Sequence, residues 1–223
     1  MTSLAALVLV PAAHAQSSCA SDGQPRPVAL LERFINADCA ACWTDTTVPH
    51  AGPGELALDW IVPGSRGDDA PLSAAATRDG LARLQALGRA VPLQADSLRQ
   101  RAQGTAARLR VAHGLPFNNY IGTAIEVKPG TGGPWTAWLA LVETIPAGTE
   151  GTAVERNLVR NLFQPAWNMR GPLSKSEQLR RLETRPMMIP EGTNADRLRV
   201  VGWLEDAKGR IQVMAQSRCV TKP

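Results

Sequence analysis

The chain has 223 residues, of which 44% are hydrophobic and 20% charged, with a net charge of +4, four cysteines and three histidines. This length allows one large domain or two small ones, and a core of that size needs no disulfide scaffold. Four cysteines are also too few for a disulfide-framed mini-protein. No apolar run reaches the roughly 18 residues that a membrane-spanning helix needs, so we expect no membrane span.

Residues 1–15 have the pattern of a secretory signal peptide. Residues 4–12 form a short apolar stretch, and Ala13-His14-Ala15 is a small-x-small cleavage site. No Lys or Arg precedes the apolar stretch, and a buried N-terminal helix is the alternative interpretation. We therefore expect a periplasmic or secreted bacterial protein in an oxidising compartment.

The basic residues do not indicate a nucleic-acid partner. Residues 153–223 carry 13 basic and 7 acidic side chains, and residues 16–152 carry 11 and 13. The basic side chains are interleaved with acidic and apolar ones, whereas a nucleic-acid surface needs a concentrated basic stripe with stacking aromatics. A solvated basic face on the second half is the simplest interpretation.

The region after the signal peptide reads as alternating strands and helices. Apolar runs over 27–36 and 55–62 predict two buried strands. A short helix is expected over 39–48 with Asp38 as its N-cap, and a second helix over 74–88 ends at a glycine. A strand-helix-strand-helix order predicts a parallel sheet.

The second region is expected to be rich in β-strands after a helix over 95–109. Residues 155–163 fit either a helical turn or a strand. The other predicted elements are strands at 109–112, 121–127 and 136–145, a loop at 129–134, and a hairpin of 198–204 with 210–217. The predicted organisation is a signal peptide (1–15), an α/β domain (16–104) and a β-rich, sandwich-like region (105–223).

The pair Cys39-Ala40-Ala41-Cys42 is the chemical centre of the sequence. It lies between a predicted strand and a predicted helix, where unpaired N–H groups stabilise a thiolate at the first cysteine. Because the thiolate is the nucleophile in disulfide exchange, we expect Cys39 to attack and Cys42 to resolve the mixed disulfide. The remaining alternative is a CxxC disulfide that is merely structural or vestigial.

Metal and haem chemistry are not expected at the CxxC. A zinc knuckle needs two further ligands at suitable spacing, and the other Cys and His residues are scattered along the chain. A c-type haem site needs His after the second cysteine, where this chain has Trp43. We therefore expect no metal and no cofactor.

The other two cysteines, Cys19 and Cys219, lie near the two ends of the mature chain. In an oxidising compartment they most simply bond to each other as a structural disulfide. Closing a loop of this length stabilises the fold by roughly 4–5 kcal/mol in the chain-entropy model. A second redox relay is the functional alternative.

Residues 28–42 (VALLERFINADCAAC) and 57–88 resemble the secreted thioredoxin-like family of unknown function. The chain departs from the family where Trp43 replaces the usual proline after the second cysteine. The positions that match family motifs are Glu32, Cys39, Cys42, Asp59-Trp60, Thr77-Arg78, Val91 to Gln94 and Asn157 to Arg160. The resemblance implies a thioredoxin-like fold with an appended β-rich part, and it implies no known substrate.

The resemblance also implies roles for two further residues. Pro92 would be the cis-proline beside the CxxC, which lets the backbone at position 91 pair with a bound peptide. An ordinary loop proline is the alternative. Glu32 would be a partly buried acid that accepts the Cys42 proton, and the alternative is a surface or ion-paired glutamate, with Arg33 as partner.

Three other side chains are weaker candidates near the CxxC. His50 could tune Cys39 or be a plain loop histidine. Trp43 and Trp60 are expected to be core residues, or an apolar rim for a client chain.

Two functions are compatible with these patterns. The first is an exported thiol–disulfide oxidoreductase acting on protein thiols and disulfides through Cys39 and Cys42. The second is a non-catalytic periplasmic binding or assembly protein with a cell-envelope partner.

Overall fold

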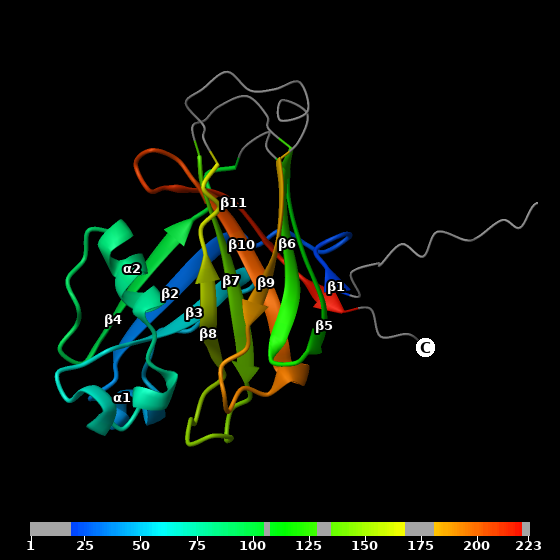
Figure 1. Ribbon diagram of the computed structural model, residues 1–223. Helices are drawn as coiled ribbons and strands as arrows, with labels where there is room; N and C mark the ends of the chain where they lie inside the picture. Colours follow the sequence, from blue (N-terminus) through cyan, green and yellow to red (C-terminus); the bar gives the residue numbers. More distant parts are fainter. Residues whose placement is uncertain (1–18, 105–107, 129–134, 168–180, 220–223) are drawn as a thin grey trace, which may run out of the picture.

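The computed structural model of the protein is mostly β-structure in two sheets (Figure 1). The predicted signal peptide (1–15) and loop (129–134) lie outside the described residues. The structure describes residues 19–104, 108–128, 135–167 and 181–219.

The larger sheet contains seven strands from the described part of the chain. These are β2 (Ala29–Asn36), β3 (Glu55–Val62), β4 (Ala95–Arg101), β7 (Thr136–Ile145), β8 (Arg156–Phe163), β10 (Leu198–Glu205) and β11 (Ile211–Gln216). Their order across the sheet is β11-β10-β7-β8-β3-β2-β4. Strand β3 runs parallel to β2 and β8, so the predicted parallel pairing of the first two strands is confirmed, and the other neighbours are antiparallel.

The smaller sheet joins the two ends of the described chain. Its strands are β1 (Cys19–Ala20), β5 (Arg108–Phe117), β6 (Tyr120–Lys128), β9 (Arg181–Met188) and β12 (Arg218–Cys219). They are ordered β12-β1-β5-β6-β9, and every pair is antiparallel. The first and last described strands are therefore hydrogen-bonded neighbours.

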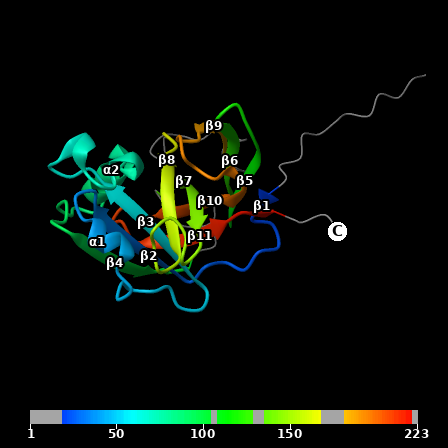
Figure 2. The same ribbon diagram turned by 90° about the horizontal axis from the view of Figure 1, so that it is seen from below.

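The helices are short, and the two α-helices pack against strands β2 and β3 of the larger sheet. They are the α-helices α1 (Ala40–Thr44) and α2 (Arg78–Ala86) and the 3-10 helices η1 (Gly67–Asp69), η2 (Ser73–Ala75) and η3 (Ala195–Arg197). Figure 2 shows α1 and α2 near β2–β4, with β5, β6 and β9 on the opposite side of the molecule. Among the described residues, no helix is long and apolar enough to cross a membrane.

The two sheets pack face to face through one apolar core. Strands β5 and β6 contribute alternate side chains that meet those of β7, β10 and β11, as expected for a half-buried pleated sheet. The core includes Val111, Ile121, Ile125, Leu139, Leu141, Val200 and Val213. Gly202 is required at this contact, because a Cβ there would lie 2.6 Å from Cγ1 of Val111.

The two faces of β2 and β3 are covered by different helices. One face carries Phe34 and Trp60, which belong to the same cluster as Leu84 on α2. The opposite face carries Ile35 and packs against Trp43 on α1. Successive side chains of β2 point to opposite faces of the sheet, so only those on the same face as Ile35 lie on the side of α1 and the CxxC.

The expected α/β fold, a thioredoxin-like domain with an appended β-rich region, is wrong. Of the described residues, only α1 and α2 are α-helical, and two packed sheets account for most of the rest. The strands of the first half continue the sheet of the second half, because Asp59 on β3 pairs with Leu158 on β8. A division between residues 104 and 105 stays a prediction.

Most predicted strands are confirmed, whereas the helix expected over 95–109 is wrong. Residues 95–101 form β4, and every residue of β4 pairs with a residue of β2. Helix propensity is a weak preference, and pairing with the edge of a buried strand overrides it. In the segment 155–163, for which the sequence allowed a helical turn or a strand, residues 156–163 form strand β8.

The ends of the two helices follow local rules. Gly88 has a φ of 64° just after α2, so the predicted glycine stop is confirmed. Asp38 is not the N-cap of α1, because Cys39 occupies that position. The Asp38 carboxylate instead accepts hydrogen bonds from the backbone N–H and hydroxyl of Ser65, at 2.8 and 2.9 Å.

Candidate functional site

The CxxC lies in the turn between β2 and α1 and is closed as a disulfide. The Cys39 and Cys42 sulfurs are 2.02 Å apart, and both residues are half-buried. The backbone N–H of Cys42 donates a hydrogen bond to Sγ of Cys39 at 3.3 Å. A donor in this position stabilises negative charge on that sulfur when the disulfide opens.

Asn36 at the end of β2 holds the CxxC turn against the segment that contains Pro92. Its carbonyl oxygen accepts from the Cys39 N–H at 2.9 Å. Its side-chain amide donates to the carbonyl oxygen of Pro92 at 2.9 Å. The structure therefore brings the sequence-predicted residues Cys39 and Pro92 to the same edge of the sheet.

The segment around Pro92 offers exposed apolar side chains beside the CxxC. Residues 89–96 line an open hollow, in which Val91 is 45% and Leu93 94% exposed. Apolar side chains exposed to this extent are available for contact with another chain.

Glu32 is fully buried, and its ion-pair partner is Arg83 on α2. Both carboxylate oxygens accept hydrogen bonds from Arg83, at 2.8 and 2.7 Å. Arg83 also pairs with Glu205 at 2.7 Å and lies over the Trp138 and Trp203 rings. This triad explains the burial of Glu32, whereas the sequence proposed Arg33 as partner. A role as proton acceptor for Cys42 stays a prediction.

A second buried charge cluster lies on the α1 side of the sheet. Asp59 on β3 accepts from Arg33 at 2.7 Å and from Arg156 at 3.3 Å. Arg156 reaches past it and donates to the carbonyl oxygens of Cys42 and Trp43, at 3.1 and 2.8 Å. Burial lowers the pKa of Arg156, and the Asp59 carboxylate opposes this. Arg156 therefore connects α1 to the sheet directly behind the CxxC.

The other sequence candidates near the CxxC are core or loop residues. Trp43 is buried on the α1 side, where its indole N–H donates to the carbonyl oxygen of Glu150 at 2.9 Å. Trp60 is buried on the opposite face and stacks on Phe34. His50 is exposed in the loop before β3.

Cys19 and Cys219 form the expected disulfide, with an S–S distance of 2.01 Å. They face each other in the pairing of β1 with β12. Cys19 is also opposite His113 on β5, a neighbour that the linear spacing of the sequence does not indicate. Burial lowers the pKa of His113, and its hydrogen bond to Gly114 opposes this.

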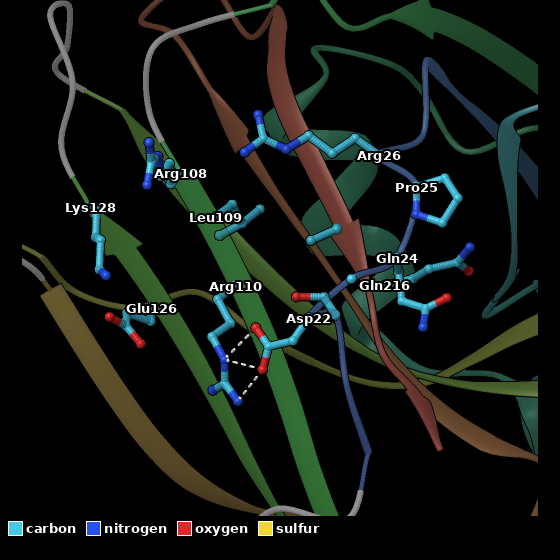
Figure 3. A pocket seen from close by; sticks show the side chains of 13 residues that line it. Asp22, Gln24, Pro25, Arg26, Arg108, Leu109, Arg110, Glu126, Lys128 and Gln216 are labelled. Carbon is cyan, nitrogen blue, oxygen red and sulfur yellow. Dashed lines mark hydrogen bonds and ion pairs between the residues drawn. The ribbon is translucent and has the colours of Figure 1, made fainter. Parts of the chain in front are cut away.

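A basic pocket of about 330 Å³ opens beside β1, β5 and β6. Figure 3 shows Asp22 facing Arg110, with their ion pair at 2.8 Å, and the side chains of Arg26, Arg108 and Lys128 around the same hollow. Arg108 and Lys128 are direct neighbours across the β5–β6 pair. Three cations thus lie around the pocket in addition to the paired Arg110, and the carboxylate of Glu126 lines the same pocket. The sequence indicated only a diffuse basic face.

Comparison with known proteins does not assign the chain to a family. Its sequence matches no protein-family model, and a search of curated proteins likewise finds no match. Membership of the secreted thioredoxin-like family therefore stays a prediction based on the residues quoted above.

Proposed function

We propose that the protein is an exported thiol–disulfide oxidoreductase that acts on protein cysteines through Cys39 and Cys42. The observation that carries this proposal is the hydrogen bond from the Cys42 N–H to the Cys39 sulfur, at a half-buried disulfide within a four-residue turn. A CxxC disulfide that served packing alone would need neither access to solvent nor a donor on its first sulfur.

The exchange conserves atoms and electrons in either direction. When the protein oxidises a client, a client thiolate attacks Sγ of Cys39, the Cys39–Cys42 bond breaks, and Cys42 leaves as a thiolate. A second client thiolate then attacks the client sulfur of the mixed disulfide and releases Cys39. Two electrons and two protons pass from the client to the CxxC. When the protein reduces a client, Cys39 attacks and Cys42 resolves.

Two structural features next to the CxxC support this chemistry. Arg156 holds the carbonyl oxygens of Cys42 and Trp43, so the turn keeps its geometry when the disulfide opens. The hollow around Pro92 places exposed Val91 and Leu93 beside the turn, where they can hold an extended client segment. Glu32 carries no step of this proposal, because it faces α2 and both of its carboxylate oxygens accept hydrogen bonds from Arg83.

Export to an oxidising compartment is part of the proposal. Two disulfides bridge all four cysteines of the chain. Structural disulfides persist in the periplasm and outside the cell, whereas the cytosol keeps thiols reduced. Together with the predicted signal peptide, this supports a periplasmic or secreted location.

A turnover assay with matched cysteine variants tests the function. Reduction of insulin disulfides and reactivation of a scrambled substrate are measured for the wild type, Cys39→Ser and Cys42→Ser. The double variant Cys19→Ser/Cys219→Ser is the control, because it removes a disulfide away from the proposed site. We expect Cys39→Ser to abolish turnover and the control to retain it. Equal turnover in the wild type and Cys39→Ser would contradict the proposal.

The basic pocket favours a second candidate function, a non-catalytic binding protein of the cell envelope. Arg26, Arg108 and Lys128 would hold an anionic group of a partner, as guanidinium and ammonium groups do for carboxylates and phosphates. Replacing Arg108 and Lys128 by Gln would then abolish envelope binding and leave CxxC turnover unchanged. Turnover that depends on Cys39 would favour the first candidate.

A further inference from the structure

Three side chains that bind soft metal ions meet where the two ends of the chain join. Cys19 on β1 is the register partner of both Cys219 on β12 and His113 on β5. One ligand atom of each of the three lies within 4.8 Å of the others. Among the described residues, this is the one group of three or more Cys, His, Asp or Glu side chains with that spacing.

The imidazole of His113 is buried, and only one of its two ring nitrogens has a hydrogen-bond partner among the described residues. The residue is 4% exposed, and its Nδ1 lies 2.9 Å from the carbonyl oxygen of Gly114. A carbonyl oxygen only accepts hydrogen bonds, so Nδ1 carries the proton and Nε2 carries the lone pair. Nε2 is buried and, within the part of the chain that the structure describes, has no hydrogen-bond partner. A buried polar atom without a partner is costly, which calls for a ligand at this position.

The hydrogen bond to Gly114 also has the form that metal-binding histidines use. A second-shell carbonyl that accepts from one ring nitrogen fixes the tautomer and directs the other nitrogen to the metal. In the disulfide state the two sulfurs have no charge to offer. Once the disulfide is reduced, they become the two thiolates that such a nitrogen needs as co-ligands.

We propose that Cys19, Cys219 and His113 form a zinc site that the Cys19–Cys219 disulfide closes and that reduction opens. Two thiolates and one imidazole are ligands that Zn²⁺ prefers, with bonds of about 2.3 Å to sulfur and about 2.0 Å to nitrogen. A water completes the tetrahedron, since Cys219 is exposed and solvent reaches the site from its side.

Reduction of the Cys19–Cys219 disulfide is coupled to oxidation of a dithiol. A dithiol reductant donates two electrons to the Cys19–Cys219 bond and becomes a disulfide, while each freed sulfur takes one proton. Zn²⁺ then displaces both protons as it binds the two thiolates and Nε2 of His113. Cys219 is the sulfur that the reductant attacks, because it is exposed whereas Cys19 is 2% exposed. In the reverse direction a disulfide oxidant accepts two electrons from the two thiolates, and the ion is released as the Cys19–Cys219 bond forms.

Cobalt and zinc titrations test the site on the full chain. Cys39→Ser/Cys42→Ser serves as background, so that only the terminal pair can supply thiolates. The protein is titrated with Co²⁺ before and after reduction by a phosphine, and Zn²⁺ is then added as competitor. We expect one Co²⁺ per chain after reduction, with thiolate-to-cobalt charge-transfer and tetrahedral d–d bands, displaced by Zn²⁺. No such band is expected before reduction.

Substitution of the third ligand decides the result. In the same background, His113→Gln should weaken Co²⁺ binding at least about tenfold, and His50→Gln, at an exposed loop position, should leave it unchanged. Cys219→Ser, which replaces an exposed side chain, should abolish the charge-transfer band and serves as a second variant should His113→Gln fail to fold. Absence of bands in the reduced background, or undiminished binding in His113→Gln or Cys219→Ser, would overturn the proposal.

Discussion

Nη2 of Arg156 lies 3.1 Å from the carbonyl oxygen of Cys42, a residue 114 positions earlier in the chain. The same nitrogen is 2.8 Å from the carbonyl oxygen of Trp43, and the guanidinium lies over the Trp43 ring. A helix of five residues satisfies few of its own terminal carbonyls, so this side chain supplies donors that the helix lacks. The orientation of the CxxC turn thus depends on a strand of the second half of the chain.

Replacement of Arg156 by Met should loosen the CxxC turn and destabilise the fold. The substitution removes the donors to α1 and one of the two cations at Asp59, which is fully buried. Breaking a buried ion pair of this kind costs about 3 kcal/mol. Urea unfolding measures the loss. Arg108→Met, at the rim of the basic pocket, is the matched control and should leave stability within about 0.5 kcal/mol.

The triad of Glu32, Arg83 and Glu205 should be the most sensitive charged group on the α2 side. In Arg83→Met, two carboxylates that are at most 6% exposed lose their shared cation. We expect a loss of about 3–5 kcal/mol in the free energy of unfolding. Arg89→Met, which breaks a half-exposed pair with Asp96, should cost less than about 1 kcal/mol. Equal losses in the two variants would contradict this account.

Asp79 should make stability fall as the pH rises through the acidic range. Burial raises its pKa above the value of 3.8 in an unfolded chain, and the hydrogen bond from the Leu162 N–H opposes this only in part. Between the unfolded and the folded pKa, the folded state holds more protons. The contribution is therefore complete below the unfolded pKa and is lost as the pH rises through the folded one.

Asp79→Asn should remove this part of the pH dependence. The amide oxygen can still accept from Leu162, but the side chain no longer ionises. From acid to neutral pH, the difference in unfolding free energy should shift in favour of the variant and then become constant. Thermal or urea unfolding of both proteins across that range measures the difference. A difference that does not change with pH would refute the prediction.

The terminal disulfide should contribute strongly to stability. In the chain-entropy model, closing a loop of 200 residues is worth about 5 kcal/mol. Cys19→Ser/Cys219→Ser should therefore lower the free energy of unfolding by an amount of that order. Cys39→Ser/Cys42→Ser, which opens a disulfide between residues only three positions apart, should cost much less. Urea unfolding of the two double variants separates the stability contributed by the Cys19–Cys219 disulfide from that contributed by the CxxC disulfide.

The sequence predicted local elements well and their assembly poorly. The strands at 29–36 and 55–62 were evident from mainly apolar runs, because both of their faces are buried. Strand β4 was missed because its sequence, ADSLRQR, has helix-forming residues and lies at a sheet edge with one exposed side. The pairing of β3 with β8, which merges the two halves, depends on contacts across about 100 residues that no local pattern encodes.

The part of the candidate site that could be predicted is the part that depends on the positions of the cysteines in the sequence. Both cysteine pairs follow from position in the chain, and both disulfides are formed as expected. Arg156 and His113 were not predicted, because each reaches its site through the register of a distant strand. The one available signal is the presence of two arginines in the strand 156–163 (RNLVRNLF), since a buried cation is rarely tolerated without a partner.

The most direct test of the central claim is the reactivity of Cys39 together with turnover. The pH dependence of alkylation of the reduced protein gives the pKa of the Cys39 thiol, in a Cys19→Ser/Cys219→Ser background that leaves only the CxxC to react. We expect a thiol pKa below the usual value of about 8.5 and reduction of insulin disulfides that disappears in Cys39→Ser. An unshifted thiol pKa, with no turnover above that variant, would contradict the proposed oxidoreductase.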